Sequence, residues 1–256
     1  MLYIKKMRPP VYVRQELTRL KSTVEWRKLA DDDVKGRREF FDQVPKEILR
    51  APLLEDQHHL CAYCMCRLSD LDKVKIEHYK PLSLGKEYAL DYDNLLAVCM
   101  GGECSEPEAG RRILCCDASK SNTELHVINP MDYECMSHIK YDRQGMIYFQ
   151  SPKEWDEERK RAAKDDINGI LQLNGKLDSS DKLIQDTATH LVKNRADAYR
   201  RYQDLMDRWS KHEKLTAAHL RGLIHKLEAK PERDAFVGVI IFFLKRKLHT
   251  LEHSST

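Results

Sequence analysis

The sequence predicts an α-rich α+β protein, because helical patterns flank a cysteine-rich middle that carries short strand patterns. Apolar residues recur at helical spacing before residue 60 and again after residue 150. All eight cysteines lie between positions 61 and 135. A chain of 256 residues can bury a hydrophobic core. We therefore expect an N-terminal helical segment over 1–60, a metal-binding core over 61–150 and a C-terminal helical region over 151–256.

The first part reads as helices from Val11 to about His59. A second helix of this part ends near 57–59 and leads directly into Cys61. Four apolar residues form one stripe of the first helix: Leu17, Leu20, Val24 and Leu29.

The middle part contains two short strand patterns, over 73–79 and 94–98. The segment after Cys116 should supply a helix next to them. Residues 139–149 place a polar turn between two apolar runs, which predicts a hairpin with Gly145 at a positive φ.

Everything beyond residue 151 reads as helical. Ser151 followed by Pro152 is a helix-start signal, since proline is favoured at the first helical position. The helices are expected over about 152–173, 180–210, 215–229 and 232–249, with breaks at 174–175, 210–211 and Pro231.

The charge is unevenly distributed along the chain. The net charge of +3 is small, but the middle part is net acidic and both flanks are net basic. This balance suits a metal site whose nucleic-acid contacts come partly from the flanks. Solvated helix faces explain the same pattern equally well.

The N-terminal ten residues lack the apolar stretch of a secretory signal. The longest apolar run, over 237–244, is too short to span a bilayer. We therefore expect a cytosolic protein without a membrane partner. In a reducing cytosol, clustered cysteines favour metal ligation over disulfides.

Cys61 and Cys64 have the spacing at which a tight turn directs two thiolates to one Zn²⁺. The set needs two further ligands. Cys104 and Cys115 are possible choices, since Cys99 and Cys104 also have a spacing that zinc permits. The interpretation that we favour for Cys66, Cys104, Cys115 and Cys135 is an ordinary thiol that binds no metal.

Five motifs in order resemble the HNH endonuclease superfamily: Cys-Ala-Tyr-Cys at 61–64, Ile-Glu-His-Tyr at 76–79, Asn-Leu-Leu-Ala-Val-Cys at 94–99, Cys-Asp-Ala-Ser-Lys at 116–120 and Asn-Pro at 129–130. Their order is similar to that in PtuB, the HNH partner in Septu-type and retron-associated anti-phage systems. The resemblance implies a zinc-stapled ββα-metal core embedded between the N-terminal helices and the C-terminal helical region. It also implies that Cys99 and Cys116 complete the structural zinc site.

Phosphodiester hydrolysis needs a base for water and a cation for the charge that develops on the phosphate. A neutral histidine is the natural base near pH 7, and His78 stands at the motif position. Glu77 and Asp117 supply hard oxygen ligands for a catalytic Mg²⁺ or a similar ion. Because neighbours on a strand point to opposite faces, Glu77 and His78 can serve one site only where the strand ends or bends.

By the resemblance, Asn94 holds the loop that carries His78 through amide hydrogen bonds. Lys120 lies one helical turn after Asp117, where it can contact phosphate or neutralise the acids. A plain surface lysine is the competing interpretation of Lys120.

The sequence thus predicts a metal-dependent HNH endonuclease acting on DNA as the effector of an anti-phage defence system. The resemblance implies an ABC/SMC-like ATPase partner (PtuA-like), and a retron reverse transcriptase with its RNA–DNA hybrid as further partners. The chain has no P-loop of its own. Two alternatives stay open: a catalytically degenerate zinc-stapled binding module, and a stand-alone restriction or toxin nuclease.

Overall fold

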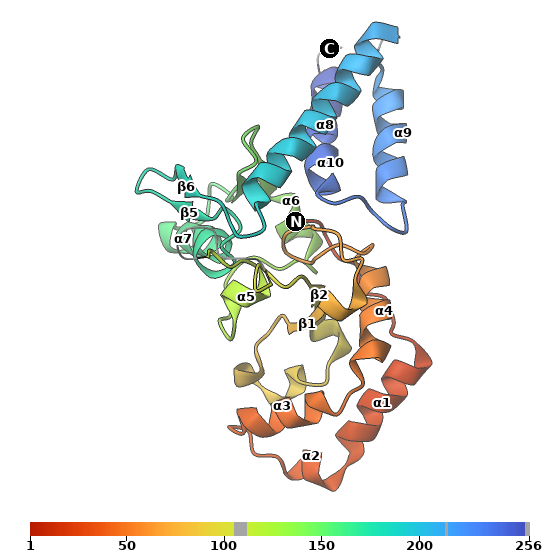
Figure 1. The fold of residues 1–256 in the computed structure, drawn as a ribbon, viewed down its shortest axis with the longest axis vertical. Helices are drawn as coiled ribbons and strands as arrows, with labels where there is room; N and C mark the ends of the chain where they lie inside the picture. The colour runs from red at the N-terminus through yellow and green to blue at the C-terminus, as the bar shows by residue number, and fades with distance from the viewer. Residues whose placement is uncertain (105–111, 213–214, 254–256) are drawn as a thin grey trace.

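A computed structural model describes residues 1–104, 112–212 and 215–253, without the side chains of 210–212. Figure 1 shows an elongated molecule with the N-terminal helices at one end and the C-terminal helices at the other. Short strands and loops lie between the two ends (Figure 1). In the described part, the strands form three separate two-stranded sheets. The predicted α-rich α+β class is confirmed.

Four helices make up the N-terminal end: α1 (Val11–Ser22), α2 (Val24–Lys28), α3 (Val34–Asp42) and α4 (Lys46–Asp56). Thr23 separates the first two, because its side chain accepts a hydrogen bond of 3.1 Å from Trp26 N and caps α2. The apolar residues that we expected on one stripe of a single helix are therefore divided between α1 and α2, and Val24 is exposed. Helix α4 ends where the sequence predicted and packs on the first sheet.

The first sheet pairs β1 (Lys75–His78) with β2 (Leu95–Val98) in antiparallel register. All four side chains of β2 are buried, so this strand forms the centre of the core around the site. Between and before the strands lie four 3₁₀ turns: η1 (Leu71–Lys73), η2 (Leu82–Leu84), η3 (Lys86–Tyr88) and η4 (Tyr92–Asn94). The one-turn helix α5 (Asp117–Lys120) then follows, as the sequence predicted.

The predicted hairpin over 139–149 is confirmed. Strands β3 (Ile139–Tyr141) and β4 (Ile147–Phe149) pair antiparallel, and Gly145 has φ +90° in the turn. A Cβ at this glycine would meet the Val192 carbonyl oxygen at 2.1 Å, so the turn also needs the close approach that glycine permits. Helix α6 (Tyr133–Ser137) precedes the hairpin.

The prediction of continuous helix over 152–173 is wrong at both ends. Helix α7 (Glu157–Asp165) starts later, because Asp156 rather than Ser151 caps it by accepting from Arg159 N at 2.7 Å. It continues into a π-helical turn, Asp166–Ile170, and not into further α-helix. There the buried Asp166 carboxylate accepts hydrogen bonds from the backbone N–H groups of 126–128, which fastens this turn to the loop after α5.

The prediction of helix from residue 180 is also wrong. Residues 176–185 form a second hairpin of β5 (Lys176–Leu177) and β6 (Leu183–Gln185). Its turn is set by Asp178, whose carboxylate accepts from the backbone N–H groups of Ser180 and Lys182 at 2.8 and 3.0 Å. The helical spacing of the apolar residues was thus overruled by local turn chemistry.

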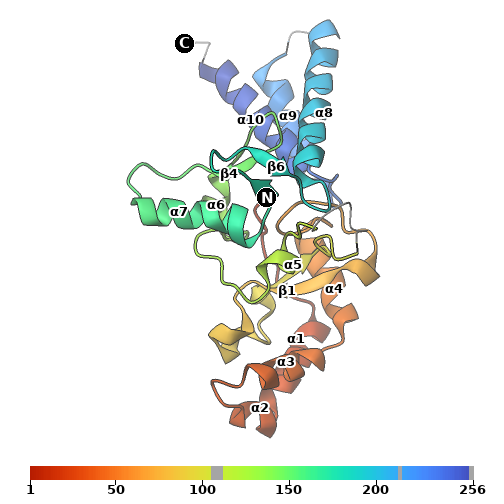
Figure 2. The same ribbon diagram turned by 60° about the vertical axis from the view of Figure 1, so that its left-hand side comes forward.

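Three helices form the C-terminal end: α8 (Leu191–His212), α9 (Ala217–Glu228) and α10 (Val237–His253). Both α8 and α9 pack against α10, and Figure 2 shows the three side by side. The last helix begins five residues after the predicted position 232, because residues 231–236 form a turn that ends with Phe236 at φ +59°. None of the helices in the described ranges combines the length and the apolar character needed to cross a bilayer.

Candidate metal centre and active site

Five cysteines gather beneath the first sheet; we call Cys61, Cys64, Cys66, Cys99 and Cys116 the cysteine cluster. The sulfur atoms of the first four lie within 4.8 Å of one another. Cys116 Sγ lies 4.0 Å from Cys61 Sγ, and Cys64 Sγ lies 3.7 Å from Cys99 Sγ. A tetrahedral site with Zn–S bonds of ~2.3 Å has S···S edges of about 3.8 Å, so these spacings fit a zinc ion.

Two backbone N–H groups donate to sulfur atoms of the cluster. Cys66 N donates to Cys64 Sγ and Cys99 N donates to Cys61 Sγ, each at 3.5 Å. Burial raises the pKa of Cys61, but hydrogen bonds from Cys116 and Cys64 outweigh it and bring that pKa to about 5. The pKa of Cys64 and that of Cys116 are instead raised, so in the ion-free protein the neighbouring sulfurs divide between thiol and thiolate. A metal ion would have to displace the remaining thiol protons.

Cys66, which we expected to be a non-ligand, lies among the possible ligands. The mutually close set of four has Cys66 as its fourth member, while Cys116 adjoins that set through Cys61. Of the other candidates, Cys104 is exposed, whereas Cys115 is buried with its sulfur 3.6 Å from Thr189 Oγ1.

Next to the cluster, the end of β1 and the start of α5 bring charged groups together. The Glu77 carboxylate and the Lys120 ammonium form an ion pair of 2.6 Å, and the Lys120 side chain is fully buried. This burial excludes the surface-lysine interpretation of Lys120, which instead neutralises an acid. Tyr63 Oη donates to Glu77 Oε1 at 3.3 Å.

Asp117 lies beside Glu77 and holds a second lysine, because Lys75 Nζ is 2.6 Å from Asp117 Oδ2. Burial raises the pKa of Glu77 to about 8, against the opposing charge of Lys120, and a hydrogen bond with Asp117 adds to the increase. Burial also raises the pKa of Asp117, but hydrogen bonds with Glu77 and Lys75 outweigh it and lower that pKa overall. Asp117 therefore stays ionised at physiological pH, and the two adjacent carboxyl groups together offer oxygen donors of the kind that a hard cation prefers.

His78 is the last residue of β1 and is buried against the ring of Phe41, with 4.3 Å between the centroids. Its Nε2 lies 3.0 Å from the Ala89 carbonyl oxygen. A carbonyl oxygen only accepts, so Nε2 carries the proton in the neutral ring and Nδ1 keeps its lone pair. Burial lowers the pKa of His78 to about 4, which keeps the ring neutral at physiological pH.

Asn94 braces the backbone that follows His78. Its Oδ1 accepts from Lys80 N at 2.7 Å, while its Nδ2 donates to the carbonyl oxygens of Lys80 and Tyr88 at 3.0 Å each. Tyr79 N also donates to the Asn94 carbonyl oxygen at 2.9 Å. These four bonds fix the direction in which the chain leaves β1.

A pocket of about 280 Å³ brings these groups to the surface. We call it the carboxylate pocket; it is lined by Arg38, Lys75, Ile76, Glu77, His78, Pro81, Leu82, Glu103, Asp117, Ala118, Ser121 and Asn122. Glu77 and His78 both reach it because β1 ends at His78. Asn94 and Lys120 support the pocket from behind without lining it.

The sequence interpretation missed two cations of this pocket. Lys75 precedes Glu77 by two positions on β1 and shares its face, a signal that strand periodicity contains. Arg38 is exposed on α3, about forty residues before the motif, and is brought to the pocket by tertiary packing alone. No local pattern identifies Arg38.

No protein-family model matches the chain. Over 96 aligned residues it is 36% identical to an Escherichia coli protein named "Retron Ec83 putative HNH endonuclease". The match covers 33% of this chain and 36% of that protein, so the chain spans about a third of the relative's length. This partial likeness, together with a cysteine cluster able to hold a metal, supports an HNH endonuclease family for the chain.

Proposed function

We propose that this chain is a metal-dependent HNH endonuclease that hydrolyses phosphodiester bonds of DNA. The partial likeness to a retron HNH endonuclease supports the reaction class. The order of β1, β2 and α5 around the carboxylate pocket is compatible with a ββα-metal core of the HNH kind. The carrying observation is the neutral His78 ring, fixed by the Ala89 carbonyl in a pocket that also holds two carboxylates.

In this proposal His78 Nδ1 accepts the proton of the attacking water. The Nε2–H bond to Ala89 prevents the ring from rotating, so the lone pair is oriented before substrate binds. Asn94 acts as a positioning residue, because its amide holds the Lys80 backbone directly after the base. Arg38 at the pocket wall is available for a phosphate oxygen.

Glu77 and Asp117 would hold the catalytic Mg²⁺ or a similar ion, since two carboxylates form a hard donor set. When bound, the ion supplies positive charge for the phosphate and the leaving oxygen. Lys75 must then release Asp117. The ammonium already lies 3.2 Å from Glu103 Oε1, so it can remain paired with Glu103 alone.

The cysteine cluster would hold a structural Zn²⁺ through Cys61, Cys64, Cys99 and Cys116. Three of these sulfurs belong to the mutually close set, in which Cys66 is the fourth member. We favour Cys116 over Cys66 because its sulfur lies 4.0 Å from Cys61 Sγ, close to the edge of a tetrahedral zinc site, and because the resemblance to HNH nucleases links the last cysteine to the Asp117 that follows it.

We further propose that the nuclease serves an anti-phage system, with an ABC/SMC-like ATPase docked on the C-terminal helices and a retron reverse transcriptase with its RNA–DNA hybrid nearby. The name of the E. coli relative supports the retron context. Co-purification of the ATPase with the full chain from high salt, where long-range attraction is screened, tests the docking. Failure of the complex to form at low and high salt alike would overturn it.

His78→Ala tests the function directly. General-base catalysis contributes roughly 10²–10⁴-fold, so plasmid cleavage by the chain with its ATPase should fall by about that factor. Zinc content and melting temperature should stay near those of the wild type. His126→Ala is the matched control, since that ring lies outside the carboxylate pocket.

Retained cleavage in His78→Ala would refute the proposed base. A wild-type protein that cleaves neither plasmid nor RNA with its ATPase and Mg²⁺ present would favour a zinc-stapled binding module instead. Cleavage without any ATPase would favour a stand-alone nuclease.

A further inference from the structure

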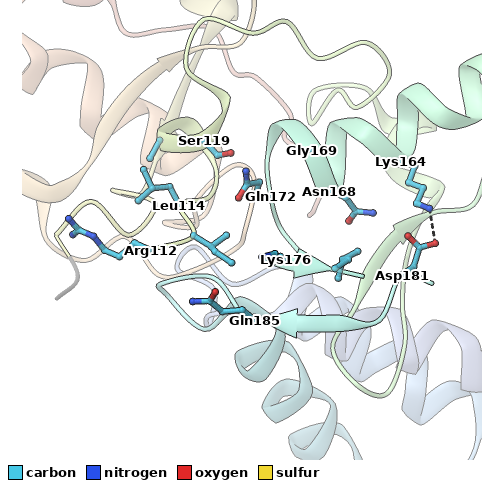
Figure 3. A pocket seen from close by; sticks show the side chains of 14 residues that line it. Arg112, Leu114, Ser119, Lys164, Asn168, Gly169, Gln172, Lys176, Asp181 and Gln185 are labelled. Atoms are coloured by element: carbon cyan, nitrogen blue, oxygen red, sulfur yellow. Dashed lines mark hydrogen bonds and ion pairs between the residues drawn. The ribbon is translucent and has the colours of Figure 1, made fainter. Parts of the chain in front are cut away.

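A second pocket, of about 820 Å³, adjoins the carboxylate pocket across α5. Ala118 lines both pockets, while Asp117 faces only the first and Ser119 only the second. The remaining walls come from residues 112–114, the π-helical turn and the β5–β6 hairpin, as Figure 3 shows. We call this space the hairpin pocket.

The lining of the hairpin pocket combines apolar side chains with polar ones, and its acidic side chain among the described residues is paired with a lysine. Three amide side chains, Asn168, Gln172 and Gln185, reach it from different elements. Its carboxylate, Asp181, is paired with Lys164 at 2.6 Å (Figure 3). Lys176 adds a further exposed positive charge on the hairpin.

Unusual backbone geometry shapes this wall. The helix leaves α-geometry at the π-helical turn, and Gln172 follows in the left-handed region at φ +46°. Gly175, at φ +68°, lies so close to the hairpin that a Cβ would meet the Gln185 carbonyl oxygen at 2.3 Å. Strained positions and π-turns concentrate at functional sites, so this wall has the character of a binding surface.

We propose that the hairpin pocket receives an unpaired nucleotide of the substrate next to the cleaved phosphate. This inference rests on the proposed nuclease function and adds a substrate class to it: nucleic acid with a displaced or single-stranded nucleotide at the cleavage position. Amide side chains present donors and acceptors together, as a nucleobase edge requires. Lys176 matches the accompanying phosphate.

The size and position of the pocket agree with this occupant. Small-ligand pockets measure roughly 300–1,000 Å³, which includes the observed volume. Helix α5 has four residues and a length of about 6 Å. Nucleotides along a strand rise by about 3.4 Å each, so a strand passes this helix within about two nucleotides. A stacked, paired base cannot enter such a pocket and must first leave the duplex.

The test is a binding measurement with the full chain in EDTA, so that cleavage does not interfere. The probes are a fluorescent blunt DNA duplex and the same duplex with one unpaired central nucleotide. Wild-type protein should bind the second probe roughly tenfold more tightly, the size expected for a well-recognised base edge. A ribonucleotide at the unpaired position shows whether RNA satisfies the pocket as well as DNA does.

Gln185→Ala should remove most of this preference while leaving blunt-duplex binding largely unchanged, and Lys176→Ala should weaken binding of the probe with the unpaired nucleotide through loss of a phosphate contact. Both side chains are exposed on the hairpin, so folding is unaffected. Lys182→Ala is the matched control: it removes one lysine from the same hairpin, outside the pocket lining. The control should retain the full preference.

Equal binding of both probes by the wild type would overturn the inference, as would equal loss of preference in the control. The result is separable from the nuclease proposal. His78→Ala should bind both probes as the wild type does, so a failed cleavage assay with an intact preference refutes the reaction and not the pocket. Intact cleavage without a preference for the unpaired nucleotide refutes only the proposed role of the hairpin pocket.

Discussion

The cysteine cluster and the carboxylate pocket are neighbours of opposite character. Cys116 belongs to the first and Asp117, the next residue, to the second. Three cluster sulfurs belong to fully buried residues, whereas the pocket opens to solvent between exposed cations such as Arg38. Closed sites with four protein ligands are structural, and sites with open positions are catalytic. The contrast supports our proposal of one structural ion in the cluster and one catalytic ion in the pocket.

Because Cys116 and Asp117 are consecutive residues, we expect the carboxylate pocket to depend on the cysteine cluster more than the cluster depends on the pocket. Helix α5 has a single turn, so its position depends on its surroundings. Cys116 links it to the cluster, and the buried Glu77–Lys120 ion pair links it to β1. We expect a metal-bound cluster to be the stronger of the two supports. Damage to the cluster should thus abolish both sites, while damage to the pocket should leave the cluster intact.

The largest effect is expected for Cys64→Ser. Loss of a structural zinc removes binding free energy that serves folding, and we predict destabilisation by more than about 3 kcal/mol with loss of the bound zinc. Elemental analysis and thermal unfolding measure both. Cys104→Ser should keep the zinc, because that cysteine is exposed and outside the cluster.

A comparison of Cys66→Ser with Cys116→Ser then identifies the fourth ligand. We expect the zinc to be lost only from the Cys116 variant. Zinc loss from the Cys66 variant alone would identify Cys66 as the fourth ligand. Retention of zinc by Cys64→Ser would refute the structural zinc site.

A smaller effect is expected for the pH dependence of divalent-ion binding in the carboxylate pocket. The pKa of Glu77 is raised to about 8 in the ion-free protein, chiefly by burial, so its carboxyl is protonated below that pH. Because a ligand must be deprotonated, the apparent affinity for Mn²⁺ or Mg²⁺ should rise up to about tenfold per pH unit toward pH 8 and then level off. Calorimetric titrations at several pH values measure this slope. Glu77→Gln should bind weakly and without the slope; a flat profile in the wild type would contradict the prediction.

The smallest effect is expected for Lys75→Met. Its ammonium competes with the ion for Asp117, at 2.6 Å from Oδ2. Removal of that charge from a partly exposed side chain should raise divalent-ion affinity by a few fold, about 1 kcal/mol. Lys73→Met, whose lysine pairs with Asp70 outside the pocket, is the control. Weaker ion binding in Lys75→Met would show that Lys75 supports the site and does not compete.

Much of the site's layout is predictable from local pattern. The spacing of Cys61 and Cys64, the strand before His78 and the helix after Cys116 are all encoded within short windows. The expectation that Glu77 and His78 serve one pocket where the strand ends agrees with β1 ending at His78. The hairpin around Gly145 was likewise readable from its turn residues.

The remaining features arise from tertiary packing, which spacing does not encode. Arg38 reaches the pocket because α3 packs on the loop after β1. Lys120 is buried because Glu77 offers it a charge partner, although a lysine so near a helix end reads as exposed. The β5–β6 hairpin replaces a predicted helix because the Asp178 turn competes successfully with helical propensity.

The separation of the two metal roles is tested most directly by following cleavage and zinc content together during mild chelation. With the proposed ATPase partner present, the protein should lose plasmid cleavage while about one zinc per chain remains bound, and Mg²⁺ alone should restore activity. The opposite result, in which cleavage continues after the labile ion is removed or disappears only when the zinc leaves, would contradict the account.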